Sequence, residues 1–93
     1  MDESRVYVDF NEMPSSNEVL LSQLDSKPAS DGNVVTFIEG QRVGVYSDDL
    51  DEHGHLCKLI ADGVAIRNQY GGWTAAARWL LRIDDRGIRH EDR

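Results

Sequence analysis

Apolar and polar residues alternate over several short segments of this chain. In residues 5–10, Val6, Val8 and Phe10 fall on one face, and the residues between them fall on the other. A period of two residues with β-branched and aromatic side chains is typical of a half-buried β-strand. Similar apolar runs predict further strands at residues 18–22, 34–38, 41–46, 56–61 and 64–67.

Turn-forming residues separate these segments. Asp62-Gly63 carries the strongest signal, because a two-residue hairpin turn needs positive φ angles that this pair adopts readily. It predicts a hairpin between the strands at 56–61 and 64–67. The polar stretch at residues 25–33 predicts an exposed, mobile loop. Further turns are expected at residues 11–17, 39–40, 48–54 and 68–72.

The pattern of residues 73–85 fits two periods. With a period of two, Trp73 and Trp79 share one face of a strand. With a period of 3.6, Trp79 lies on a helical stripe that would end near Gly87. Because the preceding strands need a closing partner, we predict a strand over residues 73–78 with Trp73 in the core. The pattern also allows a turn of helix before Gly87.

Short strands, tight turns and little helix predict an all-β fold. With five or six strands, the expected architecture is a small antiparallel SH3-like barrel that occupies residues 1–93 as a single domain. In such a barrel the first strand would pair with the last, which leaves no exposed edge. Residues 90–93 are expected to form a frayed tail.

Composition narrows the class of protein. Hydrophobic residues make up 40% of the chain and charged residues 29%. No apolar run reaches the roughly 18 residues of a membrane helix, and the acidic N-terminus lacks the apolar region of a signal peptide. We therefore expect a cytoplasmic protein without membrane attachment. The single cysteine, Cys57, agrees, since one thiol cannot form a disulfide within the chain.

The formal net charge of −7 is distributed unevenly. Residues 1–66 contain 13 acidic and 4 basic residues, whereas residues 67–93 contain 4 acidic and 6 basic residues, all arginine. The acidic excess argues against direct binding to nucleic acid, which depends on neutralising phosphates. An acidic body with an arginine-bearing end is compatible with head-to-tail pairing, so we expect a monomer or a weak homodimer.

Four short motifs along the chain carry a resemblance to other proteins. They are Val-Tyr-Val-Asp-Phe-Asn at residues 6–11, Glu-Gly-Gln-Arg-Val at 39–43 with an Asp-Asp turn after it, Trp-Thr-Ala-Ala-Ala-Arg-Trp at 73–79 and Ile-Arg-His at 88–90. Over most of its length the chain thereby resembles a group of small bacterial proteins. It departs from that group between Trp79 and Ile88, where its spacing is longer. The resemblance implies an SH3-like barrel and assigns a function to no residue.

Metal-binding and catalytic motifs are weak. On an extended strand, His53, His55 and Cys57 would share one face and offer ligands for zinc or copper. The glycine between the two histidines interrupts that strand, and no second Cys/His pair completes a four-ligand site. The acidic residues before them resemble the start of a calcium loop but lack its final glutamate. We therefore predict no cofactor and no enzyme activity, and we interpret both histidines as solvated turn residues.

The acidic turn and one aromatic residue form the predicted contact site. Asp48, Asp49, Asp51 and Glu52 gather carboxylates that would steer a basic protein surface towards them. Tyr70 lies in a glycine-flanked turn, where an exposed aromatic side chain can contact a partner. The leading interpretation is a non-enzymatic protein-interaction module. The alternative is an acidic inhibitor that mimics nucleic acid and occupies a nucleic-acid-binding protein, and a third is a metal-binding protein.

Overall fold

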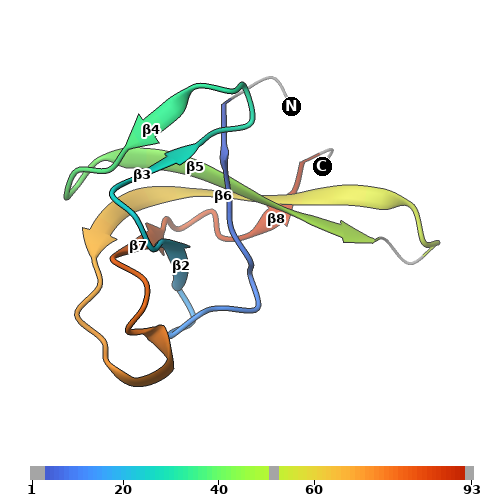
Figure 1. Ribbon diagram of the computed structural model, residues 1–93. Helices are drawn as coiled ribbons and strands as arrows, with labels where there is room; N and C mark the ends of the chain where they lie inside the picture. The colour runs from blue at the N-terminus through green and yellow to red at the C-terminus, as the bar shows by residue number, and fades with distance from the viewer. Residues whose placement is uncertain (1–3, 51–52, 92–93) are drawn as a thin grey trace.

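A curled β-sheet makes up most of the molecule (Figure 1). The computed structural model describes residues 4–50 and 53–91. The main sheet has the order β1-β5-β6-β7-β2, with β8 paired to β6, and a small second sheet joins β3 and β4. The predicted all-β class is confirmed, and the main sheet forms half of a barrel. The elements are β1 (Val6–Tyr7), β2 (Glu18–Ser22), β3 (Ser26–Pro28), β4 (Val34–Thr36), β5 (Arg42–Leu50), β6 (Leu56–Arg67), the 3-10 turn η1 (Gly72–Thr74), β7 (Trp79–Ile83) and β8 (Arg89–His90).

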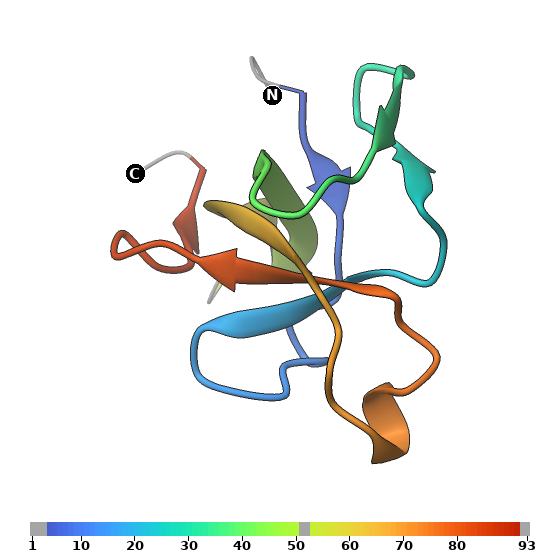
Figure 2. The ribbon, with the colours of Figure 1, turned by 90° about the vertical axis from the view of Figure 1, so that its left-hand side faces the viewer.

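The main sheet is curled (Figure 2), and the hydrophobic core lies on its inner face. Alternate residues of the longer strands point into it, as Val43 and Val45 do from β5. The predicted strand at residues 18–22 coincides with β2 and is confirmed. Side chains from the main sheet and the connecting loops complete the core: Val6, Val8, Val19, Leu21, Ala29, Phe37, Ala61, Ala65, Trp79, Leu81 and Ile83.

The hairpin predicted at Asp62-Gly63 is wrong. Strand β6 runs through these residues without a turn, and Gly63 pairs with Val43 on one side and Ile83 on the other. A Cβ at Gly63 would lie 2.0 Å from the backbone oxygen of Arg82. The glycine is therefore needed because a neighbouring backbone approaches closely, not because the chain reverses.

The strand predicted for residues 73–78 is also wrong. The amide group of Asn68 donates hydrogen bonds to the backbone oxygens of Thr74 (2.8 Å) and Ala77 (2.9 Å), which fixes a loop there. Strand β7 begins only at Trp79. Trp73, predicted in the core, is 65% exposed, and Trp79 is 2% exposed and packs against Phe37 instead.

The sequence predicted that the first strand would pair with the last, and this prediction is wrong. Strand β1 is two residues long and pairs in parallel with β5, with Val6 opposite Val45. Its other side is occupied by residues 29–30, since Val6 bridges to Ala29 and Ser30 N–H donates to the Arg5 carbonyl at 2.7 Å. The two ends of the main sheet, β1 and β2, therefore meet without a ladder of backbone hydrogen bonds between them.

Two segments predicted as irregular contain short strands. Strand β3 lies within the predicted loop at residues 25–33 and pairs with β4. At the C-terminus, His90 pairs with Leu59 as part of β8, so the frayed tail is wrong at this residue, and residues 92–93 lie outside the described ranges. The helical turn allowed before Gly87 is a β-turn, in which the Gly87 N–H donates to the Asp84 carbonyl at 3.1 Å.

The β5–β6 hairpin extends well beyond the rest of the sheet (Figure 1). Strand β1 pairs with β5 only at Val45 and Tyr46, and β8 pairs with β6 only at Leu59 and Ile60. Beyond these positions, in the part of the hairpin that the structure describes, β5 and β6 pair in register with each other, and the Glu91 N–H also donates to the Lys58 carbonyl at 3.0 Å. We call residues 47–50 and 53–58 the arm. It gives the molecule its longest dimension, 38 Å against 28 and 22 Å.

Candidate functional site

The structure separates the predicted contact residues into two places. Asp48 and Asp49 lie in the β5 part of the arm, and both are exposed. Asp51 and Glu52 lie outside the described residues. Tyr70 follows the opposite end of β6, so the acidic turn and Tyr70 do not form one continuous surface.

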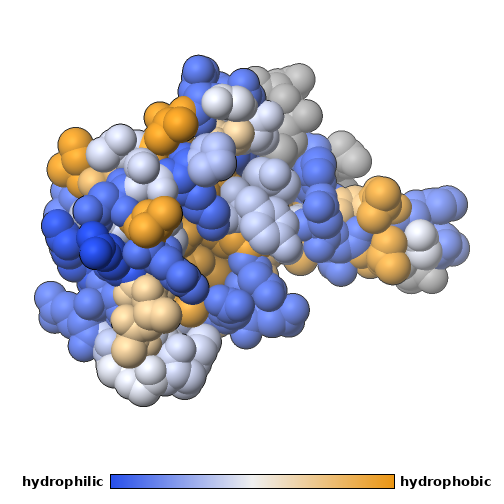
Figure 3. Space-filling view, viewed as in Figure 1, coloured by the Kyte–Doolittle hydropathy of each residue, from blue (hydrophilic) through white to orange (hydrophobic). Residues whose placement is uncertain are grey.

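Two exposed leucines form a pair near the tip of the arm. Leu50 and Leu56 lie directly opposite each other in the β5–β6 register and are 58% and 83% exposed. Directly opposed side chains in an antiparallel pair touch on one face of the ribbon. Figure 3 shows orange apolar atoms on the projecting arm beside blue polar ones. The tip thus combines apolar surface with the carboxylate of Asp49 on the other face.

An ion pair follows the leucines along the same face. Lys58 donates to Asp48 Oδ1 at 2.7 Å, and these residues are also directly opposite each other in register. The hydrogen bond from Lys58 to Asp48 raises the pKa of the lysine, which stays charged at neutral pH. The Lys58 ammonium also lies 5.0 Å from the centre of the Tyr46 ring, within the range of a cation–π contact.

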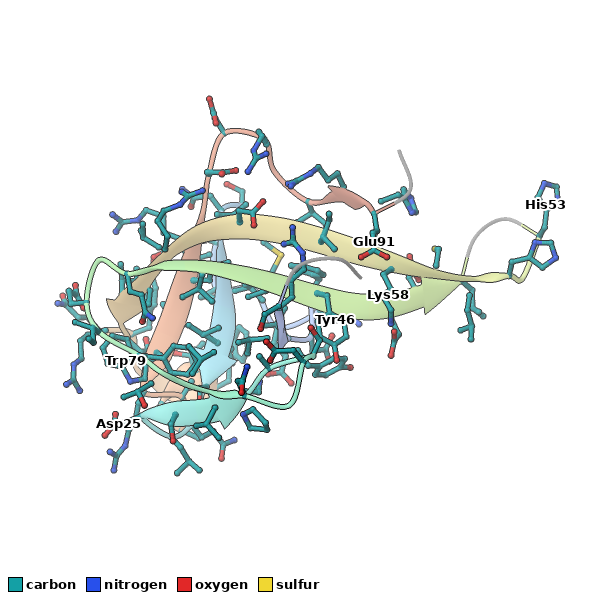
Figure 4. All side chains as sticks on the ribbon, turned by 90° about the horizontal axis from the view of Figure 1, so that it is seen from above. Asp25, Tyr46, His53, Lys58, Trp79 and Glu91 are labelled. Atoms are coloured by element: carbon teal, nitrogen blue, oxygen red, sulfur yellow. The ribbon has the colours of Figure 1, made fainter. Side chains whose placement is uncertain are left out.

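Aromatic rings mark the base of the arm. Figure 4 shows His53 at the outer end, followed towards the body by Lys58 and Tyr46. The Tyr46 ring packs edge-on against Tyr7 of β1, with the ring centres 5.6 Å apart. The outer face of the arm therefore runs from the leucine pair through the Asp48–Lys58 ion pair to these two tyrosines. Of the predicted contact residues that the structure describes, Asp48 is the one that lies on this face.

Tyr70 is held by a specific hydrogen bond. Its hydroxyl donates to Glu18 Oε1 at 2.6 Å, and this bond raises the pKa of the Tyr70 hydroxyl. The ring is 46% exposed and borders a depression of about 350 Å³ that also includes Arg67 and Arg82. Tyr70 therefore remains accessible to a partner, but its hydroxyl ties the loop before η1 to β2.

The candidate metal ligands His53, His55 and Cys57 do not gather into a site in the described residues. Among residues 4–50 and 53–91, no group of three or more His, Cys, Asp or Glu side chains is arranged to hold a metal ion. The rings of His53 and His55 lie 6.3 Å apart between their centres, at the end of the arm. These two residues precede β6, whereas Cys57 lies within it.

The exposed leucines could have been recognised as a pair from the sequence. They border the acidic turn, and an apolar residue on each side of a turn falls opposite its partner when the hairpin is in register. Trp73 and Leu24, which are 65% and 66% exposed, carry no such signal. Their exposure follows from the loops that hold them.

The chain matches none of the protein-family models, curated proteins or solved structures with which it was compared. The resemblance to small bacterial proteins and the SH3-like topology therefore stay predictions. No described helix has the length and apolarity to cross a bilayer.

Proposed function

We propose that this protein is a non-enzymatic interaction module that binds a protein partner through the outer face of its arm. The exposed Leu50–Leu56 pair is the observation that supports this most directly. Neither leucine is needed for the core, so their apolar surface is available to be buried on binding. Burial of such a side chain contributes about 1.5–3 kcal/mol.

The carboxylates of the arm add direction to this contact. Asp49 is exposed, and Asp51 and Glu52 add two further acidic groups to the same turn of the sequence. Charges around an apolar patch steer a complementary surface and raise the association rate more than the affinity. A partner with a basic rim around an apolar pocket fits this combination.

Affinity capture with three variants tests the proposal. The first variant, Leu50→Ser with Leu56→Ser, removes the apolar pair. The second, Asp49→Asn with Asp51→Asn and Glu52→Gln, removes charge from the arm and leaves the Asp48–Lys58 ion pair in place. The third, Asp31→Asn with Glu39→Gln and Asp85→Asn, removes the same charge elsewhere on the surface and is the matched control.

We expect one discrete partner to be captured by the wild type and by the control. The dissociation constant of the leucine variant for this partner should be tenfold or more higher than that of the wild type, since the variant loses about 2 kcal/mol of apolar burial. The acidic variant should mainly slow association, and the slowing should shrink as salt rises. Equal affinity of the leucine variant and the wild type for that partner, with both proteins folded by circular dichroism, would rule out the arm as the contact.

A further inference from the structure

A groove lies at the seam where the curled sheet stays open. It has a volume of about 670 Å³ and is bordered by β1 residues on one side and β2 residues on the other. Lys27 of β3 and the loop after η1 complete its lining. We call it the seam groove; its principal residues are Tyr7, Leu20, Leu24, Lys27, Trp73 and Ala76. In Figure 3 the middle of this face is hollowed, and apolar atoms show in the hollow between polar groups.

Lys27 closes the seam that strands leave open. Its ammonium donates to the carbonyl of Tyr7 in β1 at 2.5 Å and to the carbonyl of Leu21 in β2 at 3.1 Å. Burial lowers the pKa of Lys27, while nearby Glu12 has the opposite effect. Because two backbone carbonyls take its donors, this ammonium forms part of the groove wall and has little capacity left to bind an anion.

Large apolar side chains border the groove without being covered. Trp73 and Leu24 are about two-thirds exposed, and Tyr7 is 46% exposed. Exposed tryptophan and tyrosine side chains that line a concave surface are the residues that contribute most to binding at protein interfaces. A volume of this size is also within the range of ligand-binding clefts. The groove begins at Tyr7, where the outer face of the arm ends.

Two of the three charged side chains that line the groove are negative. Asp9 and Glu12 are the acidic residues in its lining, and Lys27 is the basic one. Since the Lys27 ammonium is held by backbone carbonyls, an occupant meets apolar side chains together with two carboxylates. A basic side chain would complement these carboxylates, and it could also stack on an exposed indole ring.

We propose that the seam groove binds an extended peptide segment of a partner protein that carries apolar side chains and a lysine or arginine. This surface is separate from the leucine pair of the arm, so either contact can fail without the other. Because the lining comes from both β1 and β2, a peptide laid along the seam would contact both strands.

Selection from a random peptide-display library on the immobilised full chain tests this proposal. We expect the enriched peptides to combine apolar residues with lysine or arginine. Their synthetic versions should bind Trp73→Ala about tenfold more weakly than the wild type. Leu24→Ser should weaken binding in the same direction, and Glu12→Gln should weaken it several-fold. Both Trp73 and Leu24 are exposed, so these changes leave the core intact.

Leu50→Ser with Leu56→Ser is the matched control, because it removes exposed apolar surface from the arm only. Its affinity for the selected peptides should equal that of the wild type. The proposal is overturned if no peptide is enriched, or if the enriched peptides are acidic or neutral. It is also overturned if binding survives Trp73→Ala and Leu24→Ser but is lost in the arm variant, which would assign the peptides to the arm.

Discussion

The carboxylate of Asp62 connects three arginines that are far apart in the sequence. Arg5 donates to its Oδ1 at 3.0 Å, and Arg86 and Arg89 donate to its Oδ2 at 2.9 and 2.7 Å. The Arg5 guanidinium is buried and also donates to the carbonyl of Ala61. Asp62 thereby joins the N-terminal segment, β6 and the turn before β8.

Replacement of Asp62 by asparagine should lower the free energy of unfolding by about 2 kcal/mol at neutral pH, because three guanidinium groups lose their shared anion. Chemical denaturation of both proteins measures this. The matched control is Asp85→Asn, an exposed change that should stay within about 0.5 kcal/mol. Equal losses in the two variants would contradict the importance of the arginine cluster.

The same carboxylate makes stability depend on pH. Burial alone would raise the pKa of Asp62, but the hydrogen bond from Arg89 and the charge of Arg5 outweigh it and lower the pKa. Its contribution is therefore complete above the unfolded-state pKa of about 3.9 and is lost as the pH falls through the lower folded-state pKa. Stability of Asp62→Asn should fall less steeply between about pH 5 and pH 2. A slope identical to the wild type would contradict this assignment.

Gly63 has no room for a side chain. Gly63→Ala should lower the free energy of unfolding by about 3 kcal/mol or more, because the new Cβ would overlap the backbone oxygen of Arg82. Gly71→Ala is the control, since no atom lies within 4 Å of the Cβ and φ is −105°. A change within about 0.5 kcal/mol is expected there. Thermal and urea unfolding of both variants measure these losses. A loss for Gly63→Ala as small as that for Gly71→Ala would show that the sheet absorbs the added methyl group.

The sequence could not show whether Gly63 forms a turn or makes room for a neighbouring backbone. Asp62-Gly63 has the composition of a hairpin turn. In the structure, the aspartate accepts hydrogen bonds from arginines, and the glycine leaves room for the backbone of the neighbouring strand. Both roles depend on residues that are distant along the chain, and local pattern carries no information about them.

At the scale of the elements, a lysine side chain replaces a strand ladder at the seam. Lys27→Met keeps the length of the side chain but removes its donors, so the carbonyls of Tyr7 and Leu21 lose a hydrogen bond. We expect a loss of about 1–3 kcal/mol. Hydrogen exchange should quicken first at the amides of β1 and β2.

Lys58→Met is the matched control for the seam, because the ion pair of Lys58 with Asp48 is exposed. The two side chains are 37% and 59% exposed. Such a pair contributes at most about 1 kcal/mol. If both lysine variants lose the same stability, or if exchange quickens uniformly over the molecule, Lys27 does not hold the seam.

Element prediction succeeded where the pattern was decided locally. Residues 18–22 form a strand as predicted, since both faces of this apolar run are buried. Residues 73–78 failed because the Asn68 side chain, through bonds to Thr74 and Ala77, overrides the alternation. Strand β3 was missed because its residues are polar and proline-containing, and their partner β4 supplies the pairing.

At the scale of the whole molecule, the arm is separable from the body. None of the core cluster lies between Ser47 and Leu59. Replacing residues 49–57 with an Asn-Gly turn that joins Asp48 to Lys58 should therefore leave the unfolding temperature within a few degrees of the wild type. It should also abolish capture of the partner proposed for the arm. Loss of cooperative unfolding, followed by calorimetry, would show that the arm supports the fold.

The candidate site was only partly predictable, because it depends on strand register and on segments that are distant in the sequence. The acidic residues stand out in composition, and the structure confirms that Asp48 and Asp49 are exposed. The pairing of Leu50 with Leu56, and the distance of Tyr70 from them, follow from the length and register of β6. The seam groove could not be predicted, because it needs β1, β2 and the loop after η1 in place together.

The pairing order of the strands has a consequence for the time course of folding. Val6 bridges to Ala29 and pairs with Val45, and Val19 pairs with Leu81. The β5–β6 hairpin joins strands that are neighbours in the sequence and pairs them along the whole of β5, so it can form early. Strand β1 can complete its parallel pairing only after β5 has been made, and β2 only after β7, so the core closes after residues 79–83 have emerged from the ribosome. The main sheet is therefore completed late in folding, and the β5–β6 hairpin, which carries the arm, is its earliest part.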